Sequence, residues 1–232
     1  MPKLFAISDL HLSFSADKPM NVFGSRWDNY EERLRQNWQE QVSQDDVVLM
    51  PGDTSWATYV KDAACDFHFI EKLNGTKIIS KGNHDYWWET LSKLNLFLET
   101  NRFSTIRFVH NTTEVFGNVA VCGTKGYPET EQEPDCDEER KLYRRELVRL
   151  ENAISEAKKT GAERIIVMLH YPPGANSAFA KVMQEENVDF CVFGHLHGGY
   201  FKNAVQGNVR GVEYRLVSCD YLKFEPLKIC EF

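Results

Sequence analysis

The stretch Lys3-Leu4-Phe5-Ala6-Ile7-Ser8-Asp9-Leu10-His11 joins an apolar run to a carboxylate and an imidazole. The run Leu4–Ser8 lacks the alternation of apolar and polar residues that marks a half-exposed strand, so it predicts a strand covered on both faces. Asp9 and His11 are two residues apart. If the extended conformation continues past the run, both side chains point to the same side of the chain and can hold one ligand together.

The same order, an apolar run and then polar residues, recurs along the chain. The further runs that predict strands are Val47–Met50, Lys77–Ser80, Ile106–His110, Val119–Gly123, Ile165–Leu169 and Phe190–Phe193. Apolar residues at helical spacing predict helices over Tyr30–Val42, Ala63–Leu73, Glu89–Leu98, Glu138–Lys159 and Ala178–Glu186. The alternation of strands and helices indicates an α/β fold with parallel strands in its first half.

The part of the chain after Gly198 has a different pattern. Strand-like segments follow one another closely there, at Tyr200–Val205, Val212–Ser218 and Leu227–Phe232. A turn signal lies between the first two of them, at Gly207-Asn208. This order predicts antiparallel C-terminal strands that form a meander, in which consecutive strands pair with one another.

Length and composition narrow the class of protein. The 232 residues fit a single domain over residues 1–232, with candidate insertions at Ser13–Asn29 and Lys125–Asp137. A net charge of −7 disfavours nucleic acid as a partner, because non-specific binding to nucleic acid needs a basic surface. The six cysteines form no C-x-x-C pair, and no apolar run approaches the roughly 18–20 residues of a membrane span. These features predict a cytoplasmic protein without a membrane partner, and they leave the oligomeric state open.

Five polar clusters each follow a strand candidate. They are Asp9-Leu10-His11, Gly52-Asp53, Gly82-Asn83-His84-Asp85, His170 and Gly194-His195-Leu196-His197. In an open α/β sheet, ligands bind beyond the carboxyl ends of the strands, so residues far apart in sequence can converge there. The clusters hold enough carboxylate, amide and imidazole groups for two divalent metal ions, of manganese, iron, zinc or nickel. The alternative, that these are capping residues at the edge of the core, explains one cluster more easily than all five.

In this order the motifs D-x-H, G-D, G-N-H-D, H and G-H-x-H resemble the calcineurin-like metallophosphoesterase superfamily. The resemblance spans Asp9 to His197, which is most of the chain. It implies a four-layer α/β/β/α sandwich of two mixed sheets, with a dinuclear metal site at one sheet edge. Carried over by position, it implies a first metal on Asp9, His11 and His197, a second on Asn83, His170 and His195, and a bridge between them at Asp53.

The resemblance also implies the roles of the two residues that follow Asn83. His84 would face the phosphate rather than a metal, and Asp85 would orient His84. Two metals about 3.5–4 Å apart can bind a bridging hydroxide and clamp phosphate oxygens, and the hydroxide attacks phosphorus. His84 would protonate the leaving alkoxide or stabilise the phosphate oxygens. The expected activity is hydrolysis of a small-molecule phosphomonoester, or of a phosphodiester or nucleotide.

Departures from the family pattern bear on the alternatives. Trp56 stands where many members carry an acidic residue or asparagine. The arginine that follows the G-D motif in protein serine/threonine phosphatases is absent, which argues against the alternative of a protein phosphatase. A catalytically silent scaffold of the same fold is a second alternative, but such scaffolds lack a full ligand set. A structural zinc protein would favour cysteine ligands, and no cysteine lies in the clusters.

Substrate contacts are harder to assign. Lys81 and Arg26 offer positive charge, Trp87 offers a ring that could stack on a base, and Asn83 stands beside the expected phosphate. The competing interpretations are a solvated surface charge for Lys81 and Arg26, and packing against the next helix for Trp87.

Overall fold

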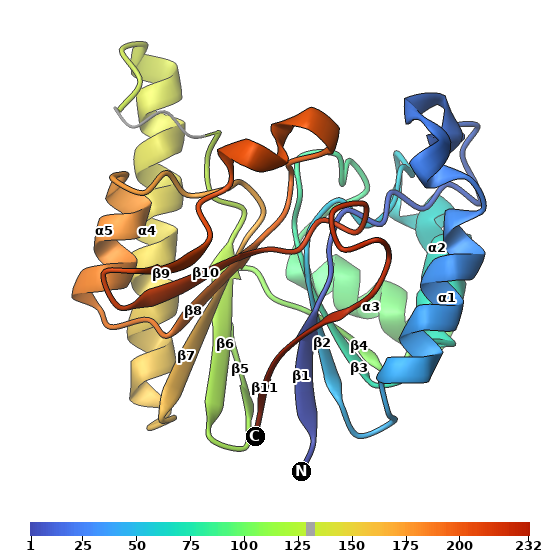
Figure 1. The fold of residues 1–232 in the computed structure, drawn as a ribbon, viewed down its shortest axis with the longest axis horizontal. Coiled ribbons are helices and arrows are strands. Elements are labelled where there is room, and N and C mark those ends of the chain that lie inside the picture. Colours follow the sequence, from blue (N-terminus) through green and yellow to red (C-terminus); the bar gives the residue numbers. More distant parts are fainter. Residues whose placement is uncertain (129–132) are drawn as a thin grey trace.

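The computed structural model describes residues 1–128 and 133–232. Within these ranges the chain forms two sheets that pack face to face, with helices on both outer faces (Figure 1). Four residues of the expected insertion Lys125–Asp137, numbers 129–132, lie outside the described residues.

The first sheet has the strand order β11-β1-β2-β3-β4. Its strands are β1 (Lys3–Ala6), β2 (Val47–Pro51), β3 (Thr76–Ser80), β4 (Ile106–Phe108) and β11 (Leu227–Glu231). The strands β1 to β4 are parallel, and β11 pairs antiparallel with β1. The helices α1 (Tyr30–Gln41), α2 (Ala64–Glu71) and α3 (Leu91–Asn101) cover its outer face (Figure 1).

The second sheet has the order β5-β6-β7-β8-β10-β9. Its strands are β5 (Thr113–Phe116), β6 (Val119–Thr124), β7 (Arg164–Leu169), β8 (Phe190–Phe193), β9 (Gly207–Val209) and β10 (Val212–Leu216). The four central strands are parallel, while β5 and β9 pair antiparallel at the two edges. The helices α4 (Asp137–Lys159) and α5 (Ala178–Glu185) cover its outer face (Figure 1).

Burial explains why the strands lack polar alternation. In β1, Phe5 packs in the cluster with the helices α1 to α3, whereas Leu4 and Ala6 pack in a second cluster with residues of the other sheet, such as Val121 and Ile166. Both faces of the strand therefore leave water, and both select apolar residues. The expected four-layer α/β/β/α sandwich of two mixed sheets is confirmed.

The C-terminal region differs in part from the expectation. The antiparallel pairing is present, in β9 with β10 and in β11 with β1. The expected strand Tyr200–Val205 is wrong, because this segment lies largely in the 3₁₀ helix η4 (Gly198–Asn203). The expected meander is also wrong, since β10 runs parallel to β8 and β11 joins the other sheet. A short apolar segment does not by itself distinguish a strand from a turn of helix.

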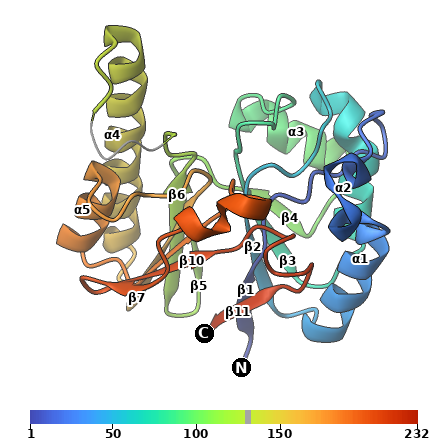
Figure 2. The same ribbon diagram turned by 45° about the horizontal axis from the view of Figure 1, so that its top comes forward.

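The carboxyl ends of the central strands meet at one end of the sandwich, where their loops are joined by backbone hydrogen bonds (Figure 2). The N–H of Asp9 donates to Gly52, that of His11 to Asp53, and that of Gly194 to His170. These bonds link loops that follow β1, β2, β7 and β8. Of the helices in the described ranges, none is long and apolar enough to cross a membrane.

Candidate metal centre

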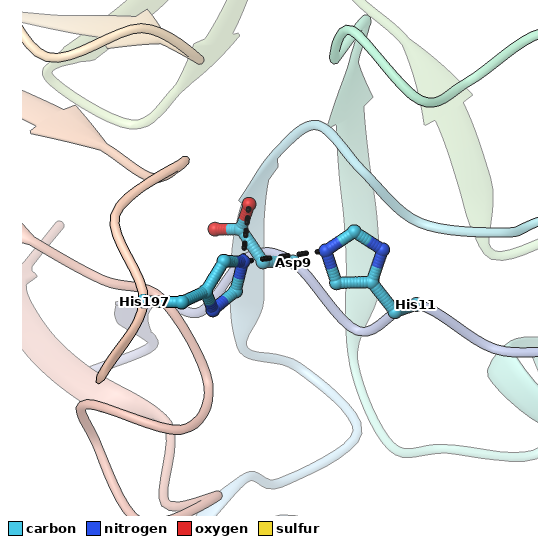
Figure 3. Close-up of side chains that lie close together, drawn as sticks. All are labelled: Asp9, His11 and His197. Carbon is cyan, nitrogen blue, oxygen red and sulfur yellow. Dashed lines mark hydrogen bonds and ion pairs between the residues drawn. The ribbon is translucent and has the colours of Figure 1, made fainter. Parts of the chain in front are cut away.

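The first expected ligand set converges from the two ends of the chain. Asp9 and His11 follow β1, and His197 follows β8. The Nε2 atoms of His11 and His197 are 3.3 Å apart, and Nε2 of His197 lies 3.8 Å from Oδ1 of Asp9 (Figure 3). One ligand atom from each of the three residues lies within 4.8 Å of the others, which suits a shared metal ion.

The second expected set converges on Asn83. Its Oδ1 atom lies 2.6 Å from Nε2 of His170 and 2.9 Å from Nδ1 of His195. These side chains follow β3, β7 and β8 respectively. The structure therefore brings an amide oxygen and two imidazole nitrogens together at one point.

Asp53 lies between the two sets. Its Oδ2 atom is 3.8 Å from Nε2 of His11 and 3.4 Å from Nε2 of His170. This position suits a bridging carboxylate. Asp9, Asp53 and His170 also form a group whose ligand atoms lie within 4.8 Å of one another, so Asp9 is close to both sets.

Hydrogen bonds to the outer ring nitrogens show that the inner nitrogens are available to a metal. Nδ1 of His170 lies 3.0 Å from the carbonyl oxygen of Pro51, and Nδ1 of His197 lies 2.8 Å from Oδ1 of Asp220. Each Nδ1 must carry a proton to make these bonds, and in the neutral ring, which is the ligating form, this leaves the Nε2 lone pair free. In both rings that lone pair faces other ligand atoms, so the donor set fits divalent cations.

The charges of the site fit cations as well. Burial raises the pKa of Asp9 above its ordinary value. Burial, together with the charges of Asp85 and Asp9, raises the pKa of Asp53 well above its ordinary value. Burial and the neighbouring histidines lower the pKa of both His11 and His170. Neutral imidazole is the ligating form, and a bound divalent cation would favour the ionised carboxylates.

The backbone is strained at the candidate ligands. Asp9, His11, Asp53 and His195 all have positive φ angles, of 58°, 47°, 51° and 73°. Non-glycine residues adopt this left-handed region rarely, and such strain gathers at functional sites. The extended conformation expected between Asp9 and His11 is therefore wrong, although the two side chains do meet.

Glycines allow the loops to approach this closely. A Cβ atom on Gly82 would overlap the backbone and carboxylate of Asp53, and one on Gly194 would overlap the carboxylate of Asp9 and the hydroxyl of Ser8. These two motif glycines are required by the close approach of other loops, rather than by their own φ angles.

Asp85 does not orient His84 as expected. Its carboxylate accepts hydrogen bonds from the N–H groups of Gly82, Asp53 and Thr54, at 2.7, 2.9 and 2.9 Å. It therefore fixes the two loops that carry Asp53 and Asn83. The ring of His84 instead has its Nδ1 3.4 Å from the hydroxyl of Tyr86. The sequence could not reveal this, because neighbouring residues in a loop can point in different directions.

His84 stands beside the two ligand sets. Its ring centroid is 5.7 Å from that of His11 and 4.6 Å from that of Trp56, and the backbone N–H of His84 donates to Oδ1 of Asp53 at 2.8 Å. The ring is half-buried, and it lines a cleft of about 720 Å³. His84 can therefore reach a molecule that binds in the cleft.

The three expected substrate contacts outside the clusters differ in their position relative to the cleft. Arg26 lines the cleft, whereas Lys81 is not among the lining residues. Trp87 is fully buried, where it packs against Phe67 and donates from Nε1 to Asp85. The expectation that Trp87 contacts substrate is therefore wrong, and its ring belongs to the core.

Asp220 was not foreseen. It follows β10 through Ser218 and Cys219, and its carboxylate accepts the Nδ1 proton of His197 and lies 3.5 Å from Nη1 of Arg26. Burial lowers the pKa of His197, but the hydrogen bond and charges of Asp220 and Asp9 together raise it above the ordinary value. The position of Asp220 shortly after a strand is the signal that could have identified it.

Comparison with known proteins decides the family. The family model for calcineurin-like phosphoesterases matches residues 2–199. The chain belongs to the calcineurin-like phosphoesterase family. All seven expected ligands, with His84 and Asp85, lie within the matched range. No curated protein matches the chain.

Solved structures share the calcineurin-like phosphoesterase fold at low identity. A protein of unknown function from Aquifex aeolicus is 14% identical, with a TM-score of 0.52 and coverage of 98% of this chain and 96% of that one. Phosphopantetheinyl hydrolase from Mycobacterium tuberculosis is 12% identical, with a TM-score of 0.57 and coverage of 98% and 95%. Sulfate thiohydrolase SoxB from Thermus thermophilus is 14% identical, with a TM-score of 0.54 and coverage of 94% and 52%. At these identities the likeness shows the fold alone.

Proposed function

We propose that this protein is a metal-dependent phosphoesterase that hydrolyses a small-molecule phosphomonoester or phosphodiester. The observation that carries the proposal is the convergence of the two ligand sets beside His84, at a cleft that His11, His195 and His197 line. Asp9, His11 and His197 would hold one divalent metal, Asn83, His170 and His195 would hold the other, and Asp53 would bridge them. The bound metals would supply Lewis-acid activation of water and neutralise charge on the phosphate.

The protein's own residues would bind and orient the phosphate. The imidazole of His84 lines the cleft, so it can donate a hydrogen bond to a phosphate oxygen. Burial and the nearby charge of Lys18 lower the pKa of His84, so the free protein carries a neutral ring near neutral pH. A phosphate anion in contact with the ring favours the imidazolium, which can then give its proton to the leaving oxygen.

Asp85 would act through position rather than through proton transfer. By accepting hydrogen bonds from Gly82, Asp53 and Thr54, it fixes the bridging carboxylate with respect to the loop of His84. Catalysis depends strongly on such positioning, because reacting groups must already lie in the right geometry when substrate arrives.

The test is a panel of substrates with purified protein loaded with Mn²⁺. It contains a phosphomonoester, a phosphodiester, several nucleotides and a phosphopeptide, and elemental analysis measures the metal content. We expect two metals per chain and turnover of a small-molecule ester. Turnover of the phosphopeptide alone would favour a protein phosphatase, and two metals without turnover of any substrate would favour a silent scaffold.

A further inference from the structure

The cleft has two ends of different chemistry. At one end the lining side chains are His11, Asp53, His84, His195 and His197, which belong to the candidate metal centre or lie beside it. The rest of the lining is mostly apolar: Trp27, Trp56 and Leu196 lie beside the histidines of the metal centre, and Met20, Phe23 and Tyr200 form what we call the apolar end. A phosphate group at the polar end would thus place the group attached to it among these apolar side chains.

The apolar lining comes from segments outside the sheets. Phe23 ends the 3₁₀ helix η1 (Met20–Phe23), and Tyr200 lies in η4. Figure 1 shows the blue segment with η1 and the orange-red η4 beyond the carboxyl ends of the strands. Phe23 is 64% exposed and Tyr200 is 68% exposed, although both line the cleft. Large rings left exposed in a concavity commonly mark a binding site.

Trp56 is held in place beside the candidate metal centre. Its ring stacks on His11 with the centroids 4.8 Å apart, and its Nε1 atom donates to the sulfur of Met20 at 3.3 Å. Nζ of Lys18 lies 4.3 Å from the ring centroid. Trp56 is partly buried by these contacts, and among the Phe, Tyr and Trp side chains that line the cleft those of Phe23 and Tyr200 are the most exposed.

The charges of the lining favour an uncharged group at the apolar end. Among the described residues that line the cleft, the charged side chains outside the metal centre are Arg26 and Asp220. They pair with each other at 3.5 Å, so the arginine charge is already partly compensated. A second phosphate or a carboxylate would have to compete with Asp220 for Arg26.

We infer that the apolar end of the cleft binds a neutral aromatic ring on the alcohol part of the phosphate ester. This inference rests on the proposed function and names its substrate class, the phosphate esters of alcohols that carry an aromatic group. The ring packs against Phe23 and Tyr200 while the phosphate lies beside His84. Aromatic pairs gain more than the burial of their area alone, so the ring contributes to both affinity and selectivity.

A binding experiment tests the aromatic subsite without turnover. Calorimetry on the protein loaded with Mn²⁺ compares benzylphosphonate, cyclohexylmethylphosphonate and ethylphosphonate, which carry the same anionic group. We expect benzylphosphonate to bind about tenfold more tightly than ethylphosphonate, and more tightly than the cyclohexyl compound. Equal affinity for all three ligands, or for the benzyl and cyclohexyl compounds, would overturn the inference.

Matched variants locate the ring. Tyr200→Ala and Phe23→Ala should each remove most of the benzyl preference and leave the affinity for ethylphosphonate unchanged. Tyr59→Ala is the control, because Tyr59 is 63% exposed but is not among the lining residues. A benzyl preference that survives both cleft variants would also overturn the inference.

Turnover separates this inference from the proposed function. Benzyl phosphate and ethyl phosphate both release alkoxides, so a higher kcat/KM for the benzyl ester reports recognition more than leaving-group reactivity. If neither ester, nor any substrate of the panel, is hydrolysed but the selective binding persists, the subsite stands and the phosphoesterase proposal fails. If both are hydrolysed with equal kcat/KM and the phosphonates bind equally, the phosphoesterase proposal stands and the aromatic subsite fails.

Discussion

The floor and the wall of the cleft are built in opposite ways. The floor consists of buried polar groups that follow strand ends, such as His11 and Asp53, whose loops are held together by backbone hydrogen bonds. The wall consists of exposed apolar rings, such as Phe23 and Tyr200, on short 3₁₀ helices outside the sheets. The floor therefore has little freedom to change, because each of its groups is positioned by several others. The wall can vary without disturbing the sheets, which suits a region that selects the substrate.

Removal of the bridging carboxylate should give the largest effect. Asp53→Asn takes away a negative charge shared by both ligand sets, so we expect loss of both metals. Each metal contributes several kcal/mol to transition-state stabilisation, and about 1.4 kcal/mol is tenfold in rate, so activity should fall by roughly 10⁴-fold or more. Elemental analysis and steady-state kinetics measure the two losses. Retention of both metals and activity would contradict the proposed part that Asp53 plays in the floor.

Substitution of His84 should separate chemistry from metal binding. His84→Ala is expected to keep both metals and to lose about 10²–10⁴-fold in kcat, the range for a positioned acid or base. His68→Ala is the matched control, because His68 is exposed on α2, outside the cleft lining. An equal loss of metal from His84→Ala would show that His84 is a ligand instead.

Asp220 contacts both His197 in the metal centre and Arg26 in the cleft lining, so its substitution should have an intermediate effect. Asp220→Asn weakens the hydrogen bond that fixes Nδ1 of His197, and partners of this kind typically contribute 10–100-fold to metal affinity or activity. Competition with a metal-binding dye measures the affinity. The exposed substitution Asp28→Asn removes the same charge and should leave metal affinity unchanged. Equal metal affinity in the Asp220 variant and the wild type would show that Asp220 does not contribute to metal binding.

The smallest effect is expected for Lys77, a buried residue of β3, whose titration changes the stability of the fold. Burial lowers the pKa of Lys77 to about 8, and its ammonium group donates to the carbonyl groups of Leu73 and Gly75. The unfolded chain holds this proton more tightly, so the free energy of unfolding should rise between about pH 8 and pH 10.5, by on the order of 1–3 kcal/mol. Urea denaturation across this range should show the rise in the wild type and lose it in Lys77→Met. The same pH dependence in both proteins would contradict the lowered pKa of Lys77.

The sequence predicted the floor better than the wall. Apolar runs that end in Asp9, Asp53 and His170 identify strand ends, and the topology of parallel strands brings those ends together. The sequence could not foresee that Asp9 and His11 adopt left-handed conformations, because this strain is imposed by contacts between loops.

The wrong or missed predictions concern residues whose side-chain direction or local structure is not determined by their neighbours in the sequence. Trp87 lies two residues after Asp85, and its ring turns into the core against Phe67, while the adjacent Tyr86 is 58% exposed. In the sequence nothing distinguishes Asp220 from a surface carboxylate, and only the fold shows that it accepts a hydrogen bond from His197. The segment from Tyr200 to Val205 has strand-like residues, yet most of it becomes a 3₁₀ helix of the cleft wall.

The pairing of β11 with β1 has a consequence for biosynthesis. Asp9 and His11 follow β1, which is made before the other strands, but the place of β1 between β2 and β11 is complete only when residues 227–231 have left the ribosome. The remaining candidate ligands emerge in between, up to His197. A nascent chain that lacks β11 therefore offers single loops with low affinity for metal, and the ordered ligand sets form only after residues 227–231 have been synthesised. Metal uptake would then follow synthesis and report that the chain has folded.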